Sequence, residues 1–433
     1  MNSLREDALS IWHAAVDAVR PQDLIGRFVQ SDAGFRAEIA AASRVLVVGA
    51  GKAGAAMAEA LESALPEHLD KLTGVVNVPA DAVRPLKRIR LHAARPAASN
   101  FPTVEGVAGA EEMLALLRGA GPDDVAVCLI SGGGSALLPA PDGVSLADKQ
   151  AVTKQLHACG ATIQEMNAVR KHLSRIKGGR LAQAFAGRTL ISLVISDVIG
   201  DPLDVIASGP TAADPSTFSD ALAFLKRYAL RAPTAVRDHL DRGASGAVPE
   251  TLKALPPYVR NVILGNNNVA LEGAAGRASA LGYVVQRHGE PDQGETAARA
   301  EDVAAVVQRG FRGLQAPVCL LYGGETTVTL GPAPGKGGRN QEYVLAMLNK
   351  LGPDGMKGVA VVSGGTDGED GPTDAAGAVA DETSWDAIKT KGLDVADHLA
   401  RHDAYPLFDA ISGLIRTGLT HTNVMDVRVI LIR

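Results

Sequence analysis

The stretch Arg44-Val-Leu-Val-Val-Gly-Ala-Gly-Lys-Ala-Gly54 decides the fold expected for this chain. A short apolar run is followed at once by glycines and then by a helical pattern. Further apolar runs alternate with helical stretches at 74–78, 125–130 and 190–195. Continuous apolar strands that alternate with helices are typical of a parallel sheet covered on both faces. The first half of the chain is therefore predicted to be a Rossmann-like, doubly wound α/β domain.

A second series of apolar runs starts at 259–264. Two of its runs flank Gly323-Gly324-Glu325, which predicts an antiparallel hairpin within a mixed sheet. Between the two halves, residues 241–250 have the composition of a linker. A chain of 433 residues is also too long for one core. We therefore expect two α/β domains, residues 1–245 and residues 246–433.

Composition excludes several classes of protein. The chain is 46% hydrophobic but only 4% aromatic and contains 47 glycines, which is typical of an α/β enzyme. A formal net charge of -5 supplies no global positive field, so nucleic acid is not an expected partner. No apolar run reaches about 18 residues, so no membrane partner is expected. Three cysteines without CxxC spacing favour a reducing compartment, and we expect the protein in the cytoplasm.

Lys52 stands in the first turn of a predicted helix, after Gly49 and Gly51. Glycine lets a backbone approach a ligand closely and aim N–H groups at an anion. A lysine at this end of a helix opposes the macrodipole at a cost of about 0.3–1 kcal/mol, which a bound anion would reverse. The glycines also satisfy GxGxxG, but the next strand ends in Asn77-Val78-Pro79 and not in an acid that binds ribose. We therefore interpret the turn as a phosphate site, with a solvated surface lysine as the alternative.

Two further strand ends carry polar residues. The loop Ser131-Gly132-Gly133-Gly134-Ser135 follows the run at 125–130 and could form an anion-binding nest at the carboxyl end of the sheet. Asp197 follows the run at 190–195, where a carboxylate can accept a hydroxyl proton or hold Mg²⁺ near phosphate oxygens. The alternatives are a flexible connecting loop for the glycines and a helix cap for Asp197.

The second half repeats the association of glycines with charge. Lys336 and Arg339 lie in a glycine-rich segment without Walker A spacing, and Arg339 directly precedes a helix expected to begin near Asn340. Asp367 belongs to an acidic loop that follows another apolar run and offers oxygen ligands suited to Mg²⁺ or Ca²⁺. In the same loop Asp370 is either such a ligand or part of a solvated acidic turn. The histidines show no zinc-ligand spacing.

Eight ordered motifs across both halves make the chain similar to the class II glycerate kinases, the glycerate 2-kinase family with a C-terminal MOFRL domain. The motifs are Gly49-Ala-Gly-Lys52-Ala53, Ser131-Gly-Gly-Gly-Ser135, Ile195-Ser-Asp-Val-Ile-Gly-Asp201, Ser208-Gly-Pro-Thr211, Gly323-Gly-Glu325, Gly337-Gly-Arg-Asn-Gln-Glu342, Ser363-Gly-Gly-Thr-Asp-Gly368 and Thr417-Gly-Leu-Thr-His-Thr-Asn-Val424. One segment departs from the family pattern: where relatives read Gly-His-Pro-x-Pro-Asp, this chain has Ala94-Arg95-Pro96-Ala97-Ala98-Ser99. Arg95 is therefore a candidate for binding a carboxylate, or the segment only borders the site.

The resemblance implies ATP-dependent, Mg²⁺-dependent phosphorylation of D-glycerate at its 2-hydroxyl, in a cleft between the two domains. It implies that Lys52 and Arg339 bind phosphate and substrate, that Asp197 accepts the hydroxyl proton, and that Asp197 and Asp367 are the metal ligands. The implied nucleotide contacts are Gly49, Gly51, Ser131, Gly132, Gly133, Gly134, Ser135, Asn266, Glu325, Lys336, Asn340 and Asp367. The partners are thus a nucleotide and a small hydroxy acid, and a homodimer is left open. The alternatives are an NAD(P)H-dependent hydroxypyruvate reductase and a non-catalytic binding module.

Overall fold

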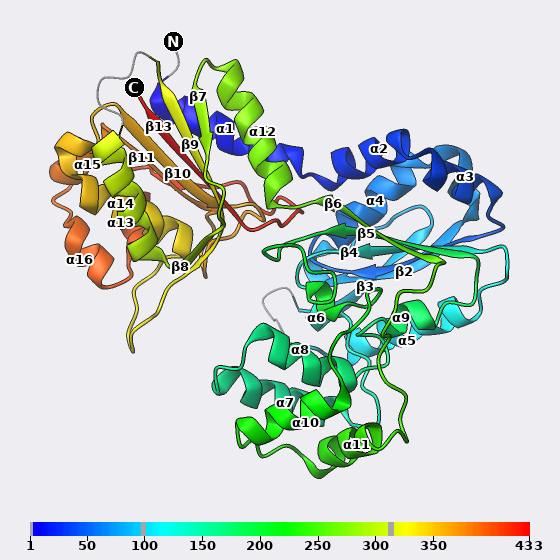
Figure 1. The fold of residues 1–433 in the computed structure, drawn as a ribbon. Coiled ribbons are helices and arrows are strands. Elements are labelled where there is room, and N and C mark those ends of the chain that lie inside the picture. Colours follow the sequence, from blue (N-terminus) through cyan, green and yellow to red (C-terminus); the bar gives the residue numbers. More distant parts are fainter. Residues whose placement is uncertain (1–2, 97–100, 311–315) are drawn as a thin grey trace. The chain divides into compact units, whose positions relative to one another are not determined.

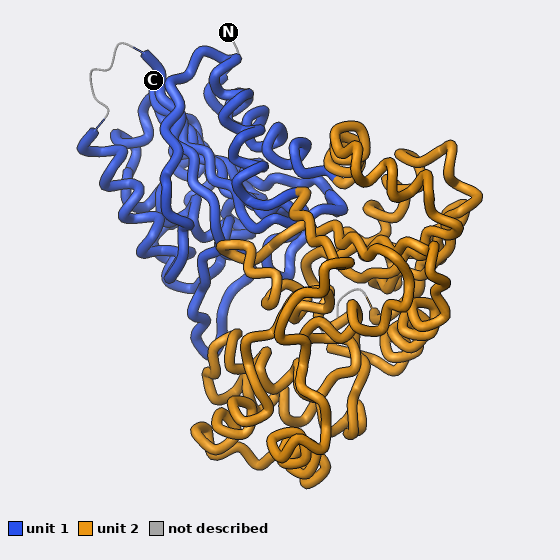
Figure 2. Tube along the Cα trace, turned by 45° about the vertical axis from the view of Figure 1, so that its right-hand side comes forward, with its two compact units in different colours: residues 1–20, 265–433 blue, residues 21–264 orange. Residues whose placement is uncertain are grey.

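The computed structural model describes residues 3–96, 101–310 and 316–433. The chain forms two compact units (Figure 2). We call residues 21–264 the parallel-sheet unit, and residues 1–20 with 265–433 the mixed-sheet unit. This division differs from the expected boundary between residues 245 and 246, because the structure moves one segment at each side of that boundary to the other unit.

The first of these segments is helix α1 (Leu4–Ala18), which belongs to the mixed-sheet unit. Its apolar face is buried, as its helical spacing predicts, and Trp12 is fully buried. The Trp12 Nε1 donates a 3.2 Å hydrogen bond to Gly364 O, in a strand of the mixed sheet. The second segment is strand β6 (Val259–Gly265), which extends the edge of the parallel sheet next to β5. Both placements follow from contacts between residues far apart in sequence.

The parallel-sheet unit contains a six-stranded sheet in the order β3-β2-β1-β4-β5-β6 (Figure 1). The neighbouring strands from β3 to β5 all pair in parallel, and every residue of β1 and β4 is buried. This confirms the predicted doubly wound parallel sheet. The strands not yet defined are β1 (Val45–Ala50), β2 (Leu72–Pro79), β3 (Ile89–Arg95), β4 (Val125–Ile130) and β5 (Thr189–Ile195).

Helices cover both faces of this sheet. One face carries α2 (Pro21–Ser31), α3 (Ala33–Ala41) and α4 (Gly54–Ala64), and the other carries α5 (Val104–Arg118) and α9 (Arg180–Gln183), as Figure 1 shows. The short helix α6 (Gly134–Leu137) follows β4. A separate helical group with its own apolar core consists of α7 (Leu146–Ala158), α8 (Ile163–His172), α10 (Phe218–Arg227) and α11 (Thr234–Ala244). Three short 3-10 helices span Pro66–Lys71, Ala80–Ala82 and Ile206–Ser208.

The mixed-sheet unit contains strands in the order β12-β11-β10-β13-β9-β7, with β8 also paired to β9. Strand β13 runs antiparallel to both β9 and β10, whereas β7 and β8 run parallel to β9, which confirms the predicted mixed sheet. The strands are β7 (Val284–Arg287), β8 (Asp292–Glu295), β9 (Val318–Thr327), β10 (Val359–Gly365), β11 (Gly377–Asp381), β12 (Leu414–Ile415) and β13 (Asp426–Ile432).

The hairpin predicted at Gly323-Gly324-Glu325 is wrong, because β9 passes through these residues as one strand. Gly323 and Gly324 pair with Val427 and Asp426 of β13. A Cβ on Gly324 would lie 2.5 Å from Asp292 O of β8, and one on Gly323 would lie 1.7 Å from Asn267 Oδ1, so these glycines allow a strand and a helix to approach closely and do not form a turn.

Two pairs of helices pack on the mixed sheet. Helices α1 and α12 (Asn267–Ala280) pack against each other, while α13 (Thr296–Gly310) and α14 (Arg339–Gly355) share an apolar core with the sheet (Figure 1). Three short helices complete the unit, namely α15 (Ser384–Thr390), α16 (Val395–Ala400) and α17 (Ala404–Ala410). Within the described ranges, no helix has both the length and the apolar character needed to cross a membrane.

Candidate anion-binding sites

The carboxyl edge of the parallel sheet gathers three of the predicted site segments. The register pairs Ala50 with Ile130, and Ile130 with Val194, so β1, β4 and β5 end at nearly the same level. The turns that follow these strands carry Lys52, the glycine loop 131–135 and Asp197. Loops at this edge of an open parallel sheet form the usual ligand site of doubly wound folds.

Backbone hydrogen bonds connect the Lys52 turn to the glycine loop. Lys52 N donates to Gly132 O at 2.8 Å, and the Ser131 hydroxyl accepts a hydrogen bond from Ala53 N at 3.0 Å. A Cβ on Gly51 would lie 1.9 Å from Ser131 Oγ, so a larger residue cannot occupy this position without moving the loop. Ser131 is fully buried and braces the two turns. Gly49 likewise allows close packing, since its Cβ would lie 2.0 Å from Leu129 O.

A second basic residue, Arg95, lies near the same loop at Gly133. Gly133 has a left-handed φ of 74° and precedes the short helix α6. A Cβ on Gly133 would lie 3.3 Å from Lys52 Cγ and 3.7 Å from Arg95 Nη2, so both basic side chains reach this glycine. Arg95 ends β3 and is only 3% exposed. The rest of the segment that departs from the family pattern, residues 97–99, lies outside the described residues.

Asp197 directly follows the buried Ser196 at the end of β5 and is itself partly exposed. Val198 N donates a 3.3 Å hydrogen bond to Ser196 Oγ, which shapes the turn around Asp197. Asp197 therefore lies at a strand end of the parallel sheet, as the sequence predicts. Its chemical role stays a prediction.

A second polar edge lies in the mixed-sheet unit, where β9 and β10 end and β13 begins. Arg339 is the first residue of α14. Its Nε donates to Asp426 Oδ2 at 2.8 Å and its Nη2 donates to Asp426 Oδ1 at 2.9 Å, a bidentate pair. Its Nη1 also lies 2.9 Å from Glu325 Oε1. Sequence reasoning missed Asp426, whose only signal is that it begins the last apolar run.

The carboxylates around Arg339 have opposite electrostatic environments. Burial works to raise the pKa of Asp426, but Arg339 and Arg428 outweigh it and hold that pKa below its usual range. Burial raises the pKa of Glu325, Arg339 opposes this, and the nearby charges of Asp426 and Asp367 add to the rise. Asp426 is therefore a fixed negative partner for Arg339, whereas Glu325 is the carboxylate that takes up a proton more readily.

Helix capping explains Asp370, and buried side-chain hydrogen bonds explain Asn340. Asp370 is 2% exposed and accepts hydrogen bonds from Asn340 N at 3.0 Å and Gln341 N at 2.9 Å, so it caps α14 and is not a solvated turn residue. Burial raises its pKa to about 6. The Asn340 side chain is fully buried, donates to Asp426 Oδ1 at 2.9 Å and accepts from Ser363 Oγ at 2.6 Å. In this arrangement Asn340 positions Asp426 and, through it, Arg339.

The remaining predicted residues of this unit occupy separate places. Lys336 is exposed, and its Nζ lies 3.8 Å from the centroid of the Tyr405 ring. Asp367 follows β10, and its Oδ1 accepts a hydrogen bond from Glu369 N at 3.1 Å. Asn266 caps α12 by accepting from Val269 N at 3.1 Å. None of these contacts tests the nucleotide binding expected of the three residues.

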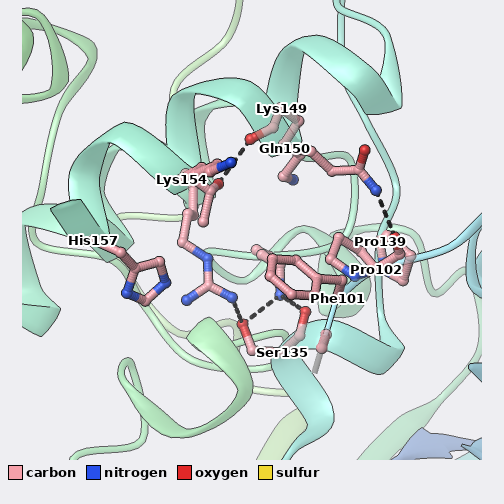
Figure 3. Close-up of a pocket in the computed structure, with 12 residues that line it drawn as sticks. Phe101, Pro102, Ser135, Pro139, Lys149, Gln150, Lys154 and His157 are labelled. Atoms are coloured by element: carbon pink, nitrogen blue, oxygen red, sulfur yellow. Dashed lines mark hydrogen bonds between the residues drawn. The ribbon is translucent and has the colours of Figure 1, made fainter. Parts of the chain in front are cut away.

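Sequence reasoning also missed a group of basic residues beside Ser135. Lys149, Arg170 and Lys177 line a pocket next to this last residue of the glycine loop (Figure 3). They lie on α7, on α8 and shortly after α8, away from the glycine turns on which the sequence interpretation relied. The density of basic residues from Arg170 to Arg180, which includes Gly178-Gly179, is the signal that could have found them.

The fold and these two edges define a class of two-unit α/β protein in which each sheet carries a basic residue beside its strand ends. A model of a domain of unknown function (DUF4147) matches residues 7–241, and the MOFRL family model matches residues 318–426. The glycerate 2-kinase of Pyrococcus horikoshii is 41% identical over 392 residues, covering 89% of this chain and 86% of that protein. An Agrobacterium vitis protein provisionally named a hydroxypyruvate reductase is 43% identical over 395 residues, covering 90% of this chain and 87% of that protein.

The crystal structure of the glycerate kinase of Thermotoga maritima superposes with a TM-score of 0.87 at 33% identity, covering 99% of each chain. The chain therefore belongs to the MOFRL-family glycerate kinases. As a member of this family it is an enzyme, a phosphotransferase that acts on an alcohol group.

Proposed function

We propose that the protein transfers the γ-phosphoryl group of ATP to the 2-hydroxyl of D-glycerate and forms 2-phosphoglycerate and ADP. The observation that carries this proposal is that Lys52 and Arg339 each stand beside a turn at the strand ends of their own unit, where the Lys52 backbone is bonded to the glycine loop and the Arg339 guanidinium is paired with Asp426. Phosphoryl transfer depends mainly on positioning and on neutralising phosphate charge, which fixed cations supply. The kinase names of the Pyrococcus and Thermotoga relatives support the same substrate.

In this mechanism Asp197 takes the proton of the substrate hydroxyl as its O–H bond breaks. The freed oxygen forms a bond to the γ-phosphorus, while the bond from that phosphorus to the β–γ bridging oxygen breaks and ADP keeps its electron pair. Lys52 and the N–H groups of the glycine loop bind phosphate oxygens, and Arg339 stabilises the charge that builds up in the transition state. Arg95, which lies near Gly133, is the candidate for the substrate carboxylate.

The proposal includes Mg²⁺, which neutralises charge on the nucleotide phosphates when it is bound. In the described part of the chain, no three His, Cys, Asp or Glu side chains gather at a possible metal site. This fits Mg²⁺, because protein sites usually hold that ion through one or two carboxylates and the substrate phosphates. Asp197 and Asp367 offer the oxygen ligands that Mg²⁺ prefers, so we propose them as its two carboxylates.

We further propose that Lys52 and Arg339 act on one nucleotide, so that the catalytic site is a cleft to which both units contribute. The experiment is a fluorescence energy transfer pair, with one dye on each unit, measured with and without MgADP and D-glycerate. We expect the distance between the dyes to respond to the ligands together. If the distance between the dyes stays the same with both ligands, in a labelled enzyme that is active, the result would count against a site shared by the units. We also propose a cytoplasmic location and leave a homodimer open, from the sequence alone.

The activity itself is tested by following ADP release from MgATP and D-glycerate, alongside NADH oxidation with hydroxypyruvate. We expect ADP release without hydride transfer, and the reverse result would overturn the proposal. Coupling the product to enolase without a mutase then distinguishes 2-phosphoglycerate from the 3-isomer.

A hydroxypyruvate reductase is the second candidate because of the name given to the Agrobacterium relative. The end of β2 argues against a dinucleotide site there. Asn77, and not an acid, occupies this strand end, and its buried amide donates to Gly106 O at 3.1 Å and Leu137 O at 2.7 Å. The carboxylate that usually binds the ribose is therefore replaced by an amide committed to internal hydrogen bonds.

A further inference from the structure

The pocket beside Ser135 lies wholly within the parallel-sheet unit. It has a volume of about 590 Å³, including the part open to solvent. One wall is apolar and comprises Phe101, Pro102, Ala136 and Pro139, and the opposite wall is formed by α7 and α8. In Figure 3 Ser135 lies at the floor of this space, with dashed lines to two basic side chains.

Three basic side chains surround this floor. Arg170 Nη2 donates to Ser135 Oγ, and Lys177 Nζ donates to Ser135 Oγ at 3.0 Å and to Ser135 O at 2.9 Å. Lys149 Nζ donates to Leu173 O at 3.0 Å. Lys149 is 5% exposed and Lys177 is 1% exposed. All of these acceptors are neutral oxygens, so the charges of the three side chains are hydrogen-bonded without being neutralised.

A neighbouring lysine shows how this chain treats a buried cation with a structural role. Lys171 is 3% exposed, and its Nζ lies 3.1 Å from both Asp204 Oδ2 and Asp214 Oδ1. By contrast, across residues 3–96, 101–310 and 316–433 no carboxylate oxygen lies within 4.0 Å of a charged nitrogen of Lys149, Arg170 or Lys177. A buried charge without a counter-ion is costly, and an anion bound in this pocket would remove that cost.

The titration of these groups reflects the same lack of a counter-ion. Burial lowers the pKa of Lys177 well below its usual value, and repulsion by Arg170, Lys149 and Lys171 adds to the effect. Burial and the charge of Arg170 lower the pKa of Lys149 to about 7, although the charge of Asp142 opposes the shift. Burial lowers the pKa of Arg170 to about 10. A bound anion would reverse all three shifts.

We propose that this pocket is an anion subsite, in which Arg170 and Lys177 beside Ser135 bind oxygens of a phosphate or carboxylate group of a ligand. Ser135 is the last residue of the glycine loop whose Gly133 approaches Lys52, so the subsite continues the polar edge of the parallel sheet within one unit. The choice of ligands rests on the proposed function: the phosphate would belong to the nucleotide and the carboxylate to the hydroxy acid.

The test is isothermal titration calorimetry of the full-length protein with ADP, with D-glycerate and with inorganic phosphate, all without Mg²⁺. The variants are Lys177→Met and Arg170→Gln, and the control is Lys226→Met, which removes one charge from an exposed position on α10. Losing a charge-assisted hydrogen bond to the ligand should weaken binding by about 10-fold to 100-fold. Weaker ADP binding with normal D-glycerate binding assigns the subsite to phosphate, and the opposite result assigns it to the carboxylate.

Thermal melting of the ligand-free proteins separates a binding role from a structural one. Removing an unneutralised buried charge should raise the melting temperature of Lys177→Met, or leave it unchanged, while the shift produced by the ligand is lost. The proposal is overturned if both variants bind every probe as tightly as the wild type, or if the wild type binds none of the three. A third outcome separates the two proposals. If the variants lose ADP binding and the wild type does not phosphorylate D-glycerate, the subsite is supported and the kinase reaction is refuted.

Discussion

Arg339 and Asp426 form a bidentate pair, with Nε to Oδ2 at 2.8 Å and Nη2 to Oδ1 at 2.9 Å. The two residues are far apart in sequence, and Asp426 is fully buried at the start of β13. The pair fixes the guanidinium plane at the first turn of α14, and it leaves Arg339 partly exposed for a ligand. A cation held in this way needs little reorganisation when phosphate charge develops.

Asp426→Asn should damage both activity and stability. The change keeps the shape of the side chain but removes the charge that pairs with Arg339 and Arg428, and breaking a buried pair costs about 3–5 kcal/mol. We expect kcat/KM for D-glycerate to fall by at least 10-fold. Urea unfolding measures the loss of stability. Asp374→Asn, at an exposed pair with Arg416, is the control and should leave stability nearly unchanged, because solvent screens the pair. Equal effects at the two positions would contradict the positioning role.

Lys52→Ala should lower kcat by about 10²-fold to 10³-fold, the usual cost of removing one fixed donor to transition-state charge. Its backbone N–H to Gly132 O is unaffected by the substitution, so the turn and the melting temperature should be preserved. Steady-state ADP release measures the rate, with the exposed Lys87→Ala as control. A variant with near-normal turnover would remove Lys52 from the catalytic site.

Gly51→Ala should destabilise the protein and impair nucleotide binding, because the new Cβ would meet Ser131 Oγ at 1.9 Å. Moving the glycine loop to relieve such a clash costs about 1–3 kcal/mol or more. Gly276→Ala is the opposite case: it lies within α12, its Cβ would meet no atom within 4 Å, and it should stabilise by about 0.5–1 kcal/mol. Urea unfolding of both variants checks the sign of each change. A Gly51→Ala protein as stable as the wild type would show that the loop yields at no cost.

Lys149→Met should change how stability depends on pH. The pKa of Lys149 falls from 10.5 to about 7 in the folded protein, so between these values the unfolded chain binds the proton and the folded chain does not. This group therefore destabilises the fold fully below pH 7, and the cost disappears as the pH rises toward 10.5. The variant should be more stable than the wild type at pH 7 and should show a smaller increase in stability between pH 7 and pH 9.5. Unchanged slopes would show that Lys149 keeps its proton in the folded protein over this pH range, so that its pKa is not lowered.

How much could be predicted depended on the range of the interactions. The strand-turn-helix pattern around Lys52 is local, since apolar runs and glycines predict both the buried β1 and the turn after it. The carboxyl-edge positions of the glycine loop and Asp197 followed from the same pattern, because parallel strands end at a shared edge. Asp426 and the pocket beside Ser135 could not be found in this way, because their partners come from distant segments without a common motif.

The sequence by itself determined that the chain builds two α/β sheets, that glycine turns follow buried strands, and that Arg339 stands at a helix start. These features rest on hydrophobic period and on turn chemistry, which act over a few residues. Lys52, expected in the first helical turn, lies in the turn just before α4. Only the tertiary structure decided that α1 joins the mixed sheet, that β6 joins the parallel sheet and that β9 runs straight through Gly323 and Gly324. Sheet order and register set these outcomes, because they are chosen by packing between residues that are remote in the chain.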